Sequence, residues 1–469
     1  MSERSFVGWR VAPRIGVVLP PERAPGWTDA AWWCALLEGW GFPAVHLRPG
    51  DPPDGCTTLV VPAEIAAGVT RPDGVSLLVT GDPASAPRGV VAFPVRADDL
   101  DHTTTSEATD VAFVALQDAA PQGLAGLWRW PEGAPACLVV DGDVDHPTGV
   151  DPECSRYVAP AIETARLAGF PAYGIFATAS NVEAEPEAFP VGAEYYNHSY
   201  THPYSHWNPA PWESLDDDEM AEELRRSDEI FRAHHGEGDH GVFRLPHFQW
   251  EAWHRSAGVL DRLGYRAESS VGSNHAVTGG LPFHQAREAW SERPADAAHL
   301  RTHPDPARRH AFLQLPISTD PGDPAFPNGC CSYNTLGEGV RDRTADPADY
   351  GDVLQRVLDD AVARRSLAHL FIDPPDAGYG RLPGDRADYA SVVQRWLAGA
   401  VARDDLAIVS TAGLTDWWIA REAALARLTL RTNDDRLVAA LEDPPRGATL
   451  ALYRPDAGWT YEPLEEDPR

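Results

Sequence analysis

Short apolar segments alternate with a longer, helix-like segment near the start of the chain. Residues 14–19, 44–47, 58–62 and 75–80 are rich in aliphatic and β-branched side chains, which is typical of buried strands. Residues 28–40 have the length and composition of a helix. Strands that alternate with helices predict a small parallel α/β layer. Neither G-x-G-x-x-G nor a P-loop follows the first strand, so this layer is expected to serve packing or assembly rather than nucleotide binding.

A second, longer series of strand and helix segments extends to about residue 420. Strands are expected at 136–140, 172–178, 241–244, within 263–270, and at 312–318, 369–373 and 406–411. Residues 214–233 predict an amphipathic helix with Ser214 as its N-cap. Residues 97–110 are polar and predict a connector, and residues 285–310 predict a surface loop.

The pattern changes again after residue 420. Residues 428–441 and 448–453 alternate between apolar and polar positions, and Asn433-Asp434 is a turn signal between strands. These features predict a small antiparallel appendage that covers apolar surface of the preceding domain. The expected domains are therefore residues 1–130, 131–420 and 421–469.

Composition narrows the classes of partner. The 469 residues include 39 Lys+Arg and 70 Asp+Glu, which gives a net charge of −31 and argues against nucleic acid or an anionic membrane surface as a partner. The N-terminus lacks a signal-peptide pattern, and no apolar run approaches the roughly 20 residues of a membrane span, so a cytoplasmic protein is expected. The six cysteines form no C-x-x-C pair, and reduced thiols are expected.

Two histidines suggest a metal site. His198 and His202 are four residues apart, a spacing that would place both imidazoles on one side of a helical turn. Imidazole suits a divalent cation such as zinc, and a catalytic site would need a third protein ligand. A polar loop with internally satisfied histidines is the alternative.

Acidic residues follow the first strand of the second series. Asp141, Asp143 and Asp145 occupy alternate positions where that strand ends, which is the edge at which α/β barrels hold their catalytic residues. Arg244 ends another strand, and its planar guanidinium could hold one of these carboxylates in a fixed orientation. The alternatives are a solvated acidic turn and a surface cation.

Five features follow one another along residues 131–420. They are the strand-end aspartates, His198-Ser-Tyr-Thr-His-Pro, Arg244-Leu-Pro, G-Y-x-x-x-S-S at 264–270 and L-P-x-S at 315–318. In this order they resemble the polysaccharide deacetylase superfamily, the NodB-homology domain. It implies an α/β fold with a distorted (β/α) barrel of fewer than eight strands. It also implies metal-dependent hydrolysis of an N-acetyl or O-acetyl group on a carbohydrate.

The resemblance also implies roles for individual residues. The implied assignments are Asp143 as the base, Asp145, His198 and His202 as metal ligands, Arg244 as the residue that orients the base, and the backbone N–H of His247 as an oxyanion donor. Asp141 and Asp143 form an alternative base and ligand pair. Zinc is the expected metal.

One position departs from the family pattern. Family members end a later strand with a histidine that protonates the leaving group, whereas this chain carries Asp373 there. Burial and the nearby aspartates would raise the pKa of Asp373, but a bound metal is expected to keep it ionised and a poor proton donor. The alternatives are that His247 donates the proton or that only O-acetyl esters, whose leaving group needs little protonation, are hydrolysed. His369 is expected at the start of that strand, far from the edge. A degenerate, non-catalytic barrel that binds a sugar or a protein partner is therefore the alternative function. Assembly into a homo-oligomer is compatible with the sequence.

Overall fold

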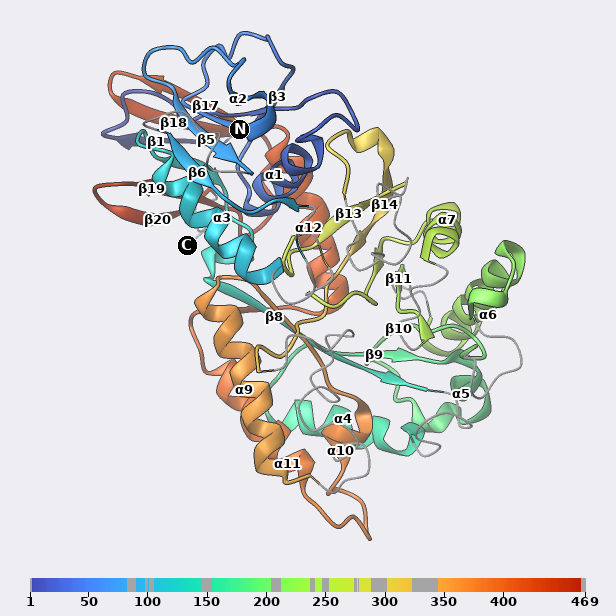
Figure 1. Ribbon diagram of the computed structural model, residues 1–469. Coiled ribbons are helices and arrows are strands. Elements are labelled where there is room, and N and C mark those ends of the chain that lie inside the picture. Colours follow the sequence, from blue (N-terminus) through green and yellow to red (C-terminus); the bar gives the residue numbers. More distant parts are fainter. Residues whose placement is uncertain are drawn as a thin grey trace.

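Figure 1 shows the fold of the chain in a computed structural model. The structure describes residues 2–81, 90–97, 100, 105–145, 154–203, 212–236, 241–246, 253–273, 276, 278–287, 302–322 and 345–464.

A nine-stranded sheet positions the candidate site. Its strand order is β13-β14-β12-β11-β10-β9-β8-β15, and β16 also pairs with β8. The strands are β8 (Ala136–Val144), β9 (Tyr173–Ala177), β10 (Glu194–Asn197), β11 (Val242–Phe243), β12 (Ala267–Glu268), β13 (Phe283–Ala286), β14 (Arg309–Gln314), β15 (Leu367–Phe371) and β16 (Leu406–Ile408). Only the β13–β14 pairing is antiparallel. This mainly parallel sheet confirms the predicted α/β class.

Strand β8 is buried on both faces, which explains its continuous apolar run. Leu138 and Val140 pack with the helices of the outer layer in one hydrophobic cluster. Cys137 and Val139 point to the opposite face of the strand and belong to a second cluster. The helices of this part are α4 (Cys154–Leu167), α5 (Ala179–Ala184), α6 (Asp217–His235), α7 (Trp253–Leu263), α9 (Pro347–Ala363), α10 (Pro374–Gly378), α11 (Tyr389–Val401) and α12 (Thr411–Leu425).

The pairing of the described strands does not form the closed barrel that the sequence predicted. The ladder begins at β13 and ends at β15. Ser318, which follows β14, donates its backbone N–H to the His369 carbonyl at 2.8 Å, and its hydroxyl accepts the His369 N–H at 2.9 Å. Pro316 lies just before this contact and has no N–H with which to extend a ladder. One residue therefore joins the two sides where a barrel would have paired strands.

The N-terminal layer is a five-stranded parallel sheet of order β3-β2-β4-β5-β6, as predicted. Its elements are β2 (Ile15–Val18), α1 (Trp27–Trp40), β3 (Ala44–Leu47), β4 (Thr58–Pro62), α2 (Ala63–Ala66), β5 (Ser76–Thr80), β6 (Val91–Phe93) and α3 (Thr105–Asp118). Helix α3 begins within the stretch predicted to be a connector, so that prediction is wrong from residue 105 onward. Its buried positions Ala108, Ala112 and Ala115 have helical spacing.

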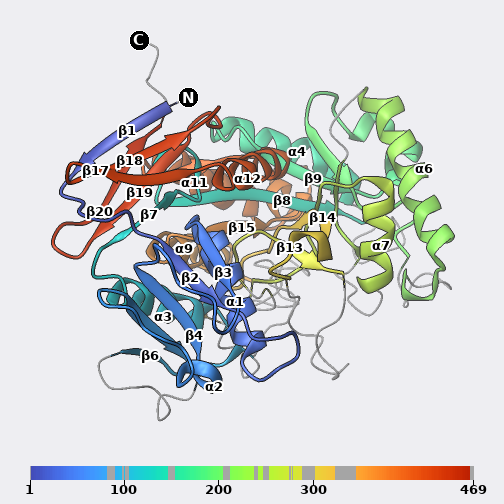
Figure 2. The same ribbon diagram turned by 90° about the horizontal axis from the view of Figure 1, so that it is seen from above.

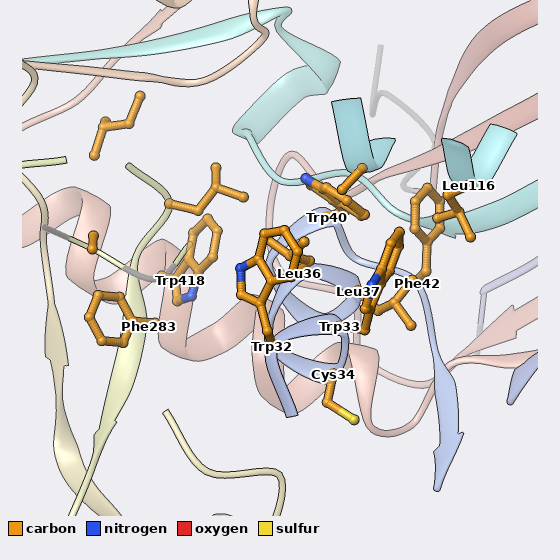
Figure 3. Close-up of a cluster of buried hydrophobic side chains, with 14 of the residues drawn as sticks. Trp32, Trp33, Cys34, Leu36, Leu37, Trp40, Phe42, Leu116, Phe283 and Trp418 are labelled. Atoms are coloured by element: carbon orange, nitrogen blue, oxygen red, sulfur yellow. The ribbon is translucent and has the colours of Figure 1, made fainter. Parts of the chain in front are cut away.

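Helix α1 joins the N-terminal layer to the large sheet. Figure 3 shows its Trp32, Trp33 and Trp40 in one cluster with Trp418 of α12 and Phe283 of β13. Because α1 is enclosed on nearly every side, it is apolar around most of its circumference.

Buried Arg421 of α12 strengthens this junction. Its guanidinium donates to the carbonyls of Glu38 at 3.2 Å and Gly39 at 3.1 Å, at the C-terminal end of α1. It also donates to the carbonyl of Trp128 at 3.1 Å. These bonds satisfy carbonyls that the end of a helix leaves without partners. Gly41, with φ of 86°, ends α1 where a Cβ would lie 1.8 Å from the Leu127 oxygen.

Strands from the two ends of the sequence share two further sheets. Strand β1 (Ser2–Val7) pairs with β18 (Arg436–Leu441), which pairs with β17 (Thr429–Asn433). Strand β7 (Leu124–Leu127) pairs with β19 (Thr449–Arg454), which pairs with β20 (Gly458–Pro463). Figure 2 shows the N- and C-terminal strands side by side. The predicted turn at Asn433-Asp434 joins β17 and β18, whereas the hairpin of β19 and β20 was not predicted, and each hairpin takes its third strand from the first 130 residues. The three domain boundaries stay a prediction.

Two local predictions are also corrected. Asp216, not Ser214, is the N-cap of α6, and its side chain forms a capping box with Glu219. The 285–310 segment is not simply a surface loop, because Thr302 and His303 are buried. Its residues 288–301 lie outside the described residues.

Within the described residues, no helix combines the length and apolar character needed to cross a membrane. The four cysteines in these ranges, Cys34, Cys56, Cys137 and Cys154, are buried free thiols, as expected, whereas Cys330 and Cys331 lie outside the ranges.

Candidate active site

The two predicted metal-binding histidines lie on a loop, not on a helical turn. The loop follows β10, and it turns back because Ser199 and His202 have φ values of 69° and 55°. The imidazole centroids of His198 and His202 are 4.8 Å apart. The predicted convergence is therefore present, but its predicted cause, helical periodicity, is wrong.

Helix α6 holds this loop through Glu223. The Glu223 carboxylate accepts the backbone N–H groups of Tyr200 at 3.0 Å and Thr201 at 2.8 Å, and the Thr201 hydroxyl at 2.9 Å. The hydroxyl of Ser199 accepts the backbone N–H of His202 at 3.0 Å. Charge-assisted bonds of this kind are stronger than neutral ones, so Glu223 fixes the backbone between the two histidines.

Asn197 fixes the start of the loop. Its Oδ1 accepts the Ser199 N–H at 2.8 Å, and its amide nitrogen is 2.8 Å from Asp228 and 2.6 Å from the Tyr265 hydroxyl. Burial raises the pKa of Asp228 to about 6, although its hydrogen bonds to Asn197 and Tyr265 oppose the rise. Sequence reasoning missed Glu223, Asn197 and Asp228, since a polar residue on an amphipathic helix or at a strand end carries no distinctive motif.

Asp145, His198 and His202 form a group that fits a metal ion. Their donor atoms all lie within 4.8 Å of one another. The Asp145 Oδ1 atom is 3.4 Å from His198 Nε2 and 3.1 Å from His202 Nε2. Tetrahedral zinc with bonds near 2.1 Å requires ligand atoms about 3.4 Å apart, so the spacing suits this ion.

The environment of His198 also suits a metal ligand. Its Nδ1 lies 3.0 Å from the Arg244 carbonyl, which assigns the ring proton to Nδ1. Its Nε2 is buried and makes no hydrogen bond to any described residue. Burial lowers the pKa of His198, but the carboxylates of Asp143 and Asp145 outweigh this effect and the net shift is upward.

Arg244 connects two of the strand-end aspartates. This fully buried guanidinium donates to Asp143 Oδ1 at 2.7 Å and to Asp141 Oδ1 at 2.8 Å. It also donates to the Ser269 carbonyl at 2.6 Å and lies 4.0 Å from the centroid of the Phe176 ring. The predicted contact between Arg244 and Asp143, the aspartate expected to act as the base, is therefore present.

Asp141 and Asp143 differ in their surroundings. Asp141 is fully buried, and Arg244 and His369 lower its pKa well below the usual range even though burial acts to raise it. Burial raises the pKa of Asp143, and Arg244 offsets only part of this effect. Of the two sequence registers, the structure brings Asp143 and Asp145, rather than Asp141, close to His198, with Asp143 Oδ2 3.6 Å from Nε2.

Asp373 lies beside Asp143. Its Oδ1 accepts the backbone N–H of Asp143 at 2.7 Å. Burial raises the pKa of Asp373 well above its usual value, as do the carboxylates of Asp143, Asp376 and Asp145. Gly142 allows this approach, because a Cβ at that position would lie 2.1 Å from the Ile372 oxygen.

Of the two remaining candidate histidines, His369 and His247, only His369 is among the described residues. His369 lies in β15, and its Nε2 is 2.7 Å from Asp141 Oδ2, so it belongs to the interior of the Asp141–Arg244 network rather than to its solvent edge. The Thr411 hydroxyl also donates to Asp141 Oδ2, at 2.8 Å. His247 lies outside the described residues.

Comparison with known proteins gives structural likenesses only. No protein-family model matches the chain, and no curated protein sequence matches it. The chain is similar to a structure described as a polysaccharide deacetylase from Mycobacterium smegmatis, with 16% identity and a TM-score of 0.43 over 65% of this chain and 95% of the other.

Two further structures show a similar extent of match. Peptidoglycan deacetylase PdaC from Bacillus subtilis has 13% identity and a TM-score of 0.29, over 62% of this chain and 94% of its own. A 4-alpha-glucanotransferase from Thermococcus litoralis has 9% identity and a TM-score of 0.34, over 60% of this chain and 40% of its own. Because all three TM-scores are below 0.5, the function is inferred from the site itself.

Proposed function

We propose that the chain is a metal-dependent hydrolase that removes an acetyl group from an N-acetylated or O-acetylated carbohydrate. The observation that carries the proposal is the convergence of Asp145, His198 and His202 next to the Asp143–Arg244 pair. The ordered motifs that resemble polysaccharide deacetylases supply the substrate class.

Asp145, His198 and His202 are the proposed ligands of one divalent cation, with zinc the metal that best suits this donor set. The bound cation would supply Lewis acidity toward water and toward a carbonyl oxygen. The hydrogen bond between His198 Nδ1 and the Arg244 carbonyl orients the imidazole toward the ion.

Asp143 is the proposed general base. Arg244 holds its Oδ1, while its Oδ2 lies on the side of His198. A carboxylate fixed in this way can take a proton from a water molecule that attacks the acetyl carbonyl. Arg244 is the proposed positioning residue, because it ties the base to the buried carboxylate of Asp141.

Asp373 is the proposed proton donor to the leaving group. It occupies the strand end at which the family pattern has a histidine, and its carboxyl is fixed on the backbone of Asp143. An amine leaving group needs this proton more than an alcohol does, so Asp373 should matter more for N-acetyl than for O-acetyl substrates.

A paired assay of acetate release tests the proposal. The zinc-loaded full chain would be given an N-acetylated and an O-acetylated oligosaccharide, with Asp143→Asn and Asp373→Asn as variants. We expect release from at least one substrate, its loss in Asp143→Asn at unchanged zinc content, and a larger effect of Asp373→Asn on the N-acetyl substrate. No release from either substrate by the zinc-loaded protein would contradict the hydrolase and favour a sugar-binding module.

A further inference from the structure

Arg129 is a buried cation for which the described residues supply no anion. The side chain follows β7 and is 3% exposed. Its Nε atom is buried and has no hydrogen-bond partner, and no described carboxylate forms an ion pair with the guanidinium. A buried charge without a partner is strongly unfavourable, so this guanidinium is expected to have a counter-ion.

Aromatic rings contact Arg129 but cannot replace an anion. The guanidinium carbon lies 4.8 Å from the Trp128 ring centroid and 5.5 Å from that of Phe113. Cation–π contacts of this kind cover the faces of the guanidinium. The Nε–H donor lies in the plane of the guanidinium, where such contacts do not reach it, and it still requires an acceptor.

The surroundings of Arg129 are positively charged in a chain whose net charge is −31. Burial lowers the pKa of Arg129 to about 9, with further lowering by Arg421 and Arg365, whereas Tyr461 and Asp110 raise it. Asp110 acts on Arg129 without forming an ion pair with it, because its ion pair is with Arg364 at 2.5 Å. Arg364 has a second carboxylate partner in Asp360, at 2.9 Å.

Arg365 is a second guanidinium without a carboxylate partner among the described residues. Its Nη1 donates to the Tyr461 hydroxyl at 2.5 Å, and its guanidinium carbon is 5.9 Å from the Tyr461 ring centroid. The Trp130 indole donates to the Arg365 carbonyl at 3.0 Å, which brings this loop to the end of β7. Two arginines without carboxylate partners thus come from separate segments to one place.

We propose that Arg129, with Arg365 beside it, binds a compact oxyanion of the carboxylate or phosphate class. The planar fork of an arginine matches the paired oxygens of such ions. The low exposure of Arg129 limits the site to a small ion or to the end of a larger one.

Arg365 lies just before the start of β15, which pairs with the start of β8, so the site is at the opposite end of β8 from Asp143. At about 3.3 Å per residue, Ala136 and Asp143 are roughly 23 Å apart, and the anion site is therefore separate from the proposed catalytic site.

Thermal unfolding of the full chain tests the proposal. Sodium phosphate and sodium acetate would be titrated in separate series at constant ionic strength, for wild type and Arg129→Met. We expect a saturable rise in the Tm of wild type with at least one anion, and the more effective anion identifies phosphate or carboxylate as the preferred class. At an anion concentration of 100 Kd, the folding equilibrium constant should rise about 100-fold.

The variants make the test specific. Arg129→Met should lose the saturable rise and, without added anion, should be at least as stable as wild type, since it removes an uncompensated charge. Arg403→Met is the control on the surface, where Arg403 is paired with Asp405, and it should keep the wild-type response.

Three results would overturn the site: no saturable response in wild type, an equal response in Arg129→Met, or a marked loss of stability in Arg129→Met without anion.

Discussion

His369 and Asp141 are hydrogen-bonded in the interior, with Nε2 2.7 Å from Oδ2 and both side chains fully buried. The same carboxylate accepts a bond from Thr411 on Oδ2 and from Arg244 on Oδ1. Asp141 therefore joins β15 and α12 to the arginine that holds the proposed base. Its own position is fixed by three donors, which is the arrangement expected of a positioning group rather than a reacting one.

His369→Ala should lower kcat for acetate release roughly 10- to 100-fold, the usual effect of losing a group that orients a metal-site residue. Zinc content should be unchanged, because His369 contacts no proposed ligand. His369→Gln retains an N–H donor and should recover part of the activity. Loss of zinc in His369→Ala would show instead that the whole site had been disturbed.

His202→Ala should weaken zinc binding by more than about 100-fold, since even the partners of metal ligands contribute 10- to 100-fold. Zinc content after dialysis and the Tm with and without a chelator are the measurements. Chelation should lower the Tm of wild type and leave that of His202→Ala unchanged. His46→Ala, an exposed site on β3, is the control. Equal zinc content in wild type and His202→Ala would exclude this ligand set.

Glu223→Ala should weaken zinc binding although Glu223 is not a proposed ligand. The carboxylate holds the backbone between the two histidines, and its removal leaves two N–H groups without their acceptor. We expect a roughly 10-fold weaker affinity. The neighbouring Glu222 is exposed and pairs only with Arg225 among the described residues, so Glu222→Ala is a matched control that should bind zinc like wild type. The loop assignment fails if the two variants bind zinc equally.

Arg244→Lys should lower both activity and stability. A lysine ammonium cannot reproduce the fork that contacts Asp141 and Asp143 together, so one buried carboxylate loses its partner. The free energy of unfolding should fall by about 3–5 kcal/mol, as measured by urea denaturation. Activity well below that of wild type at a temperature where the variant is folded is expected, and full activity there would remove Arg244 from the site.

Glu268 should make stability depend on pH. Burial raises its pKa to about 7 from an ordinary value of 4.5, only partly offset by Ser270 and Arg244. As pH rises from about 4.5 to 7, the unfolded chain loses this proton before the folded chain does, so the folded state loses stability across this window. Between pH 4.5 and 8, the unfolding free energy of wild type should therefore fall by up to roughly 3 kcal/mol relative to that of Glu268→Gln.

The matched control for this pH series is Glu462→Gln, on an exposed position of β20. It should change in parallel with wild type from pH 4.5 to 8. A parallel change in Glu268→Gln as well would mean that Glu268 ionises in the folded protein as it does in the unfolded chain.

The sequence predicted the residues that gather at the site better than the means by which they gather. Asp145, His198 and His202 could be selected because aspartates at a strand end and a close histidine pair are local patterns. The reversal of the loop at Ser199 and its attachment to Glu223 depend on contacts between segments that show no motif. His369 illustrates the same limit, since its position along a strand did not reveal its bond to a residue 228 positions away.

Fold prediction failed where a partner strand was distant in sequence. Residues 2–7 contain charged and polar side chains and do not suggest a strand until their pairing with β18 is known. The distorted barrel implied by the family resemblance depended on pairing between β14 and β15, where Ser318 is the one described residue that hydrogen-bonds across the gap. The parallel N-terminal layer was predictable, because its strands are apolar and follow one another along the chain.

The pairing of β1 with β18 also sets an order of events during synthesis on the ribosome. Ser2 pairs with Leu441, and at about 5–20 residues per second the second strand is made roughly 20–90 s after the first. Strand β7 likewise precedes its partner β19 by more than three hundred residues. A nascent chain that already contains the loop of the proposed metal ligands therefore still has two strands with unpaired edges, and such edges are templates for pairing with another chain until the last hairpins emerge.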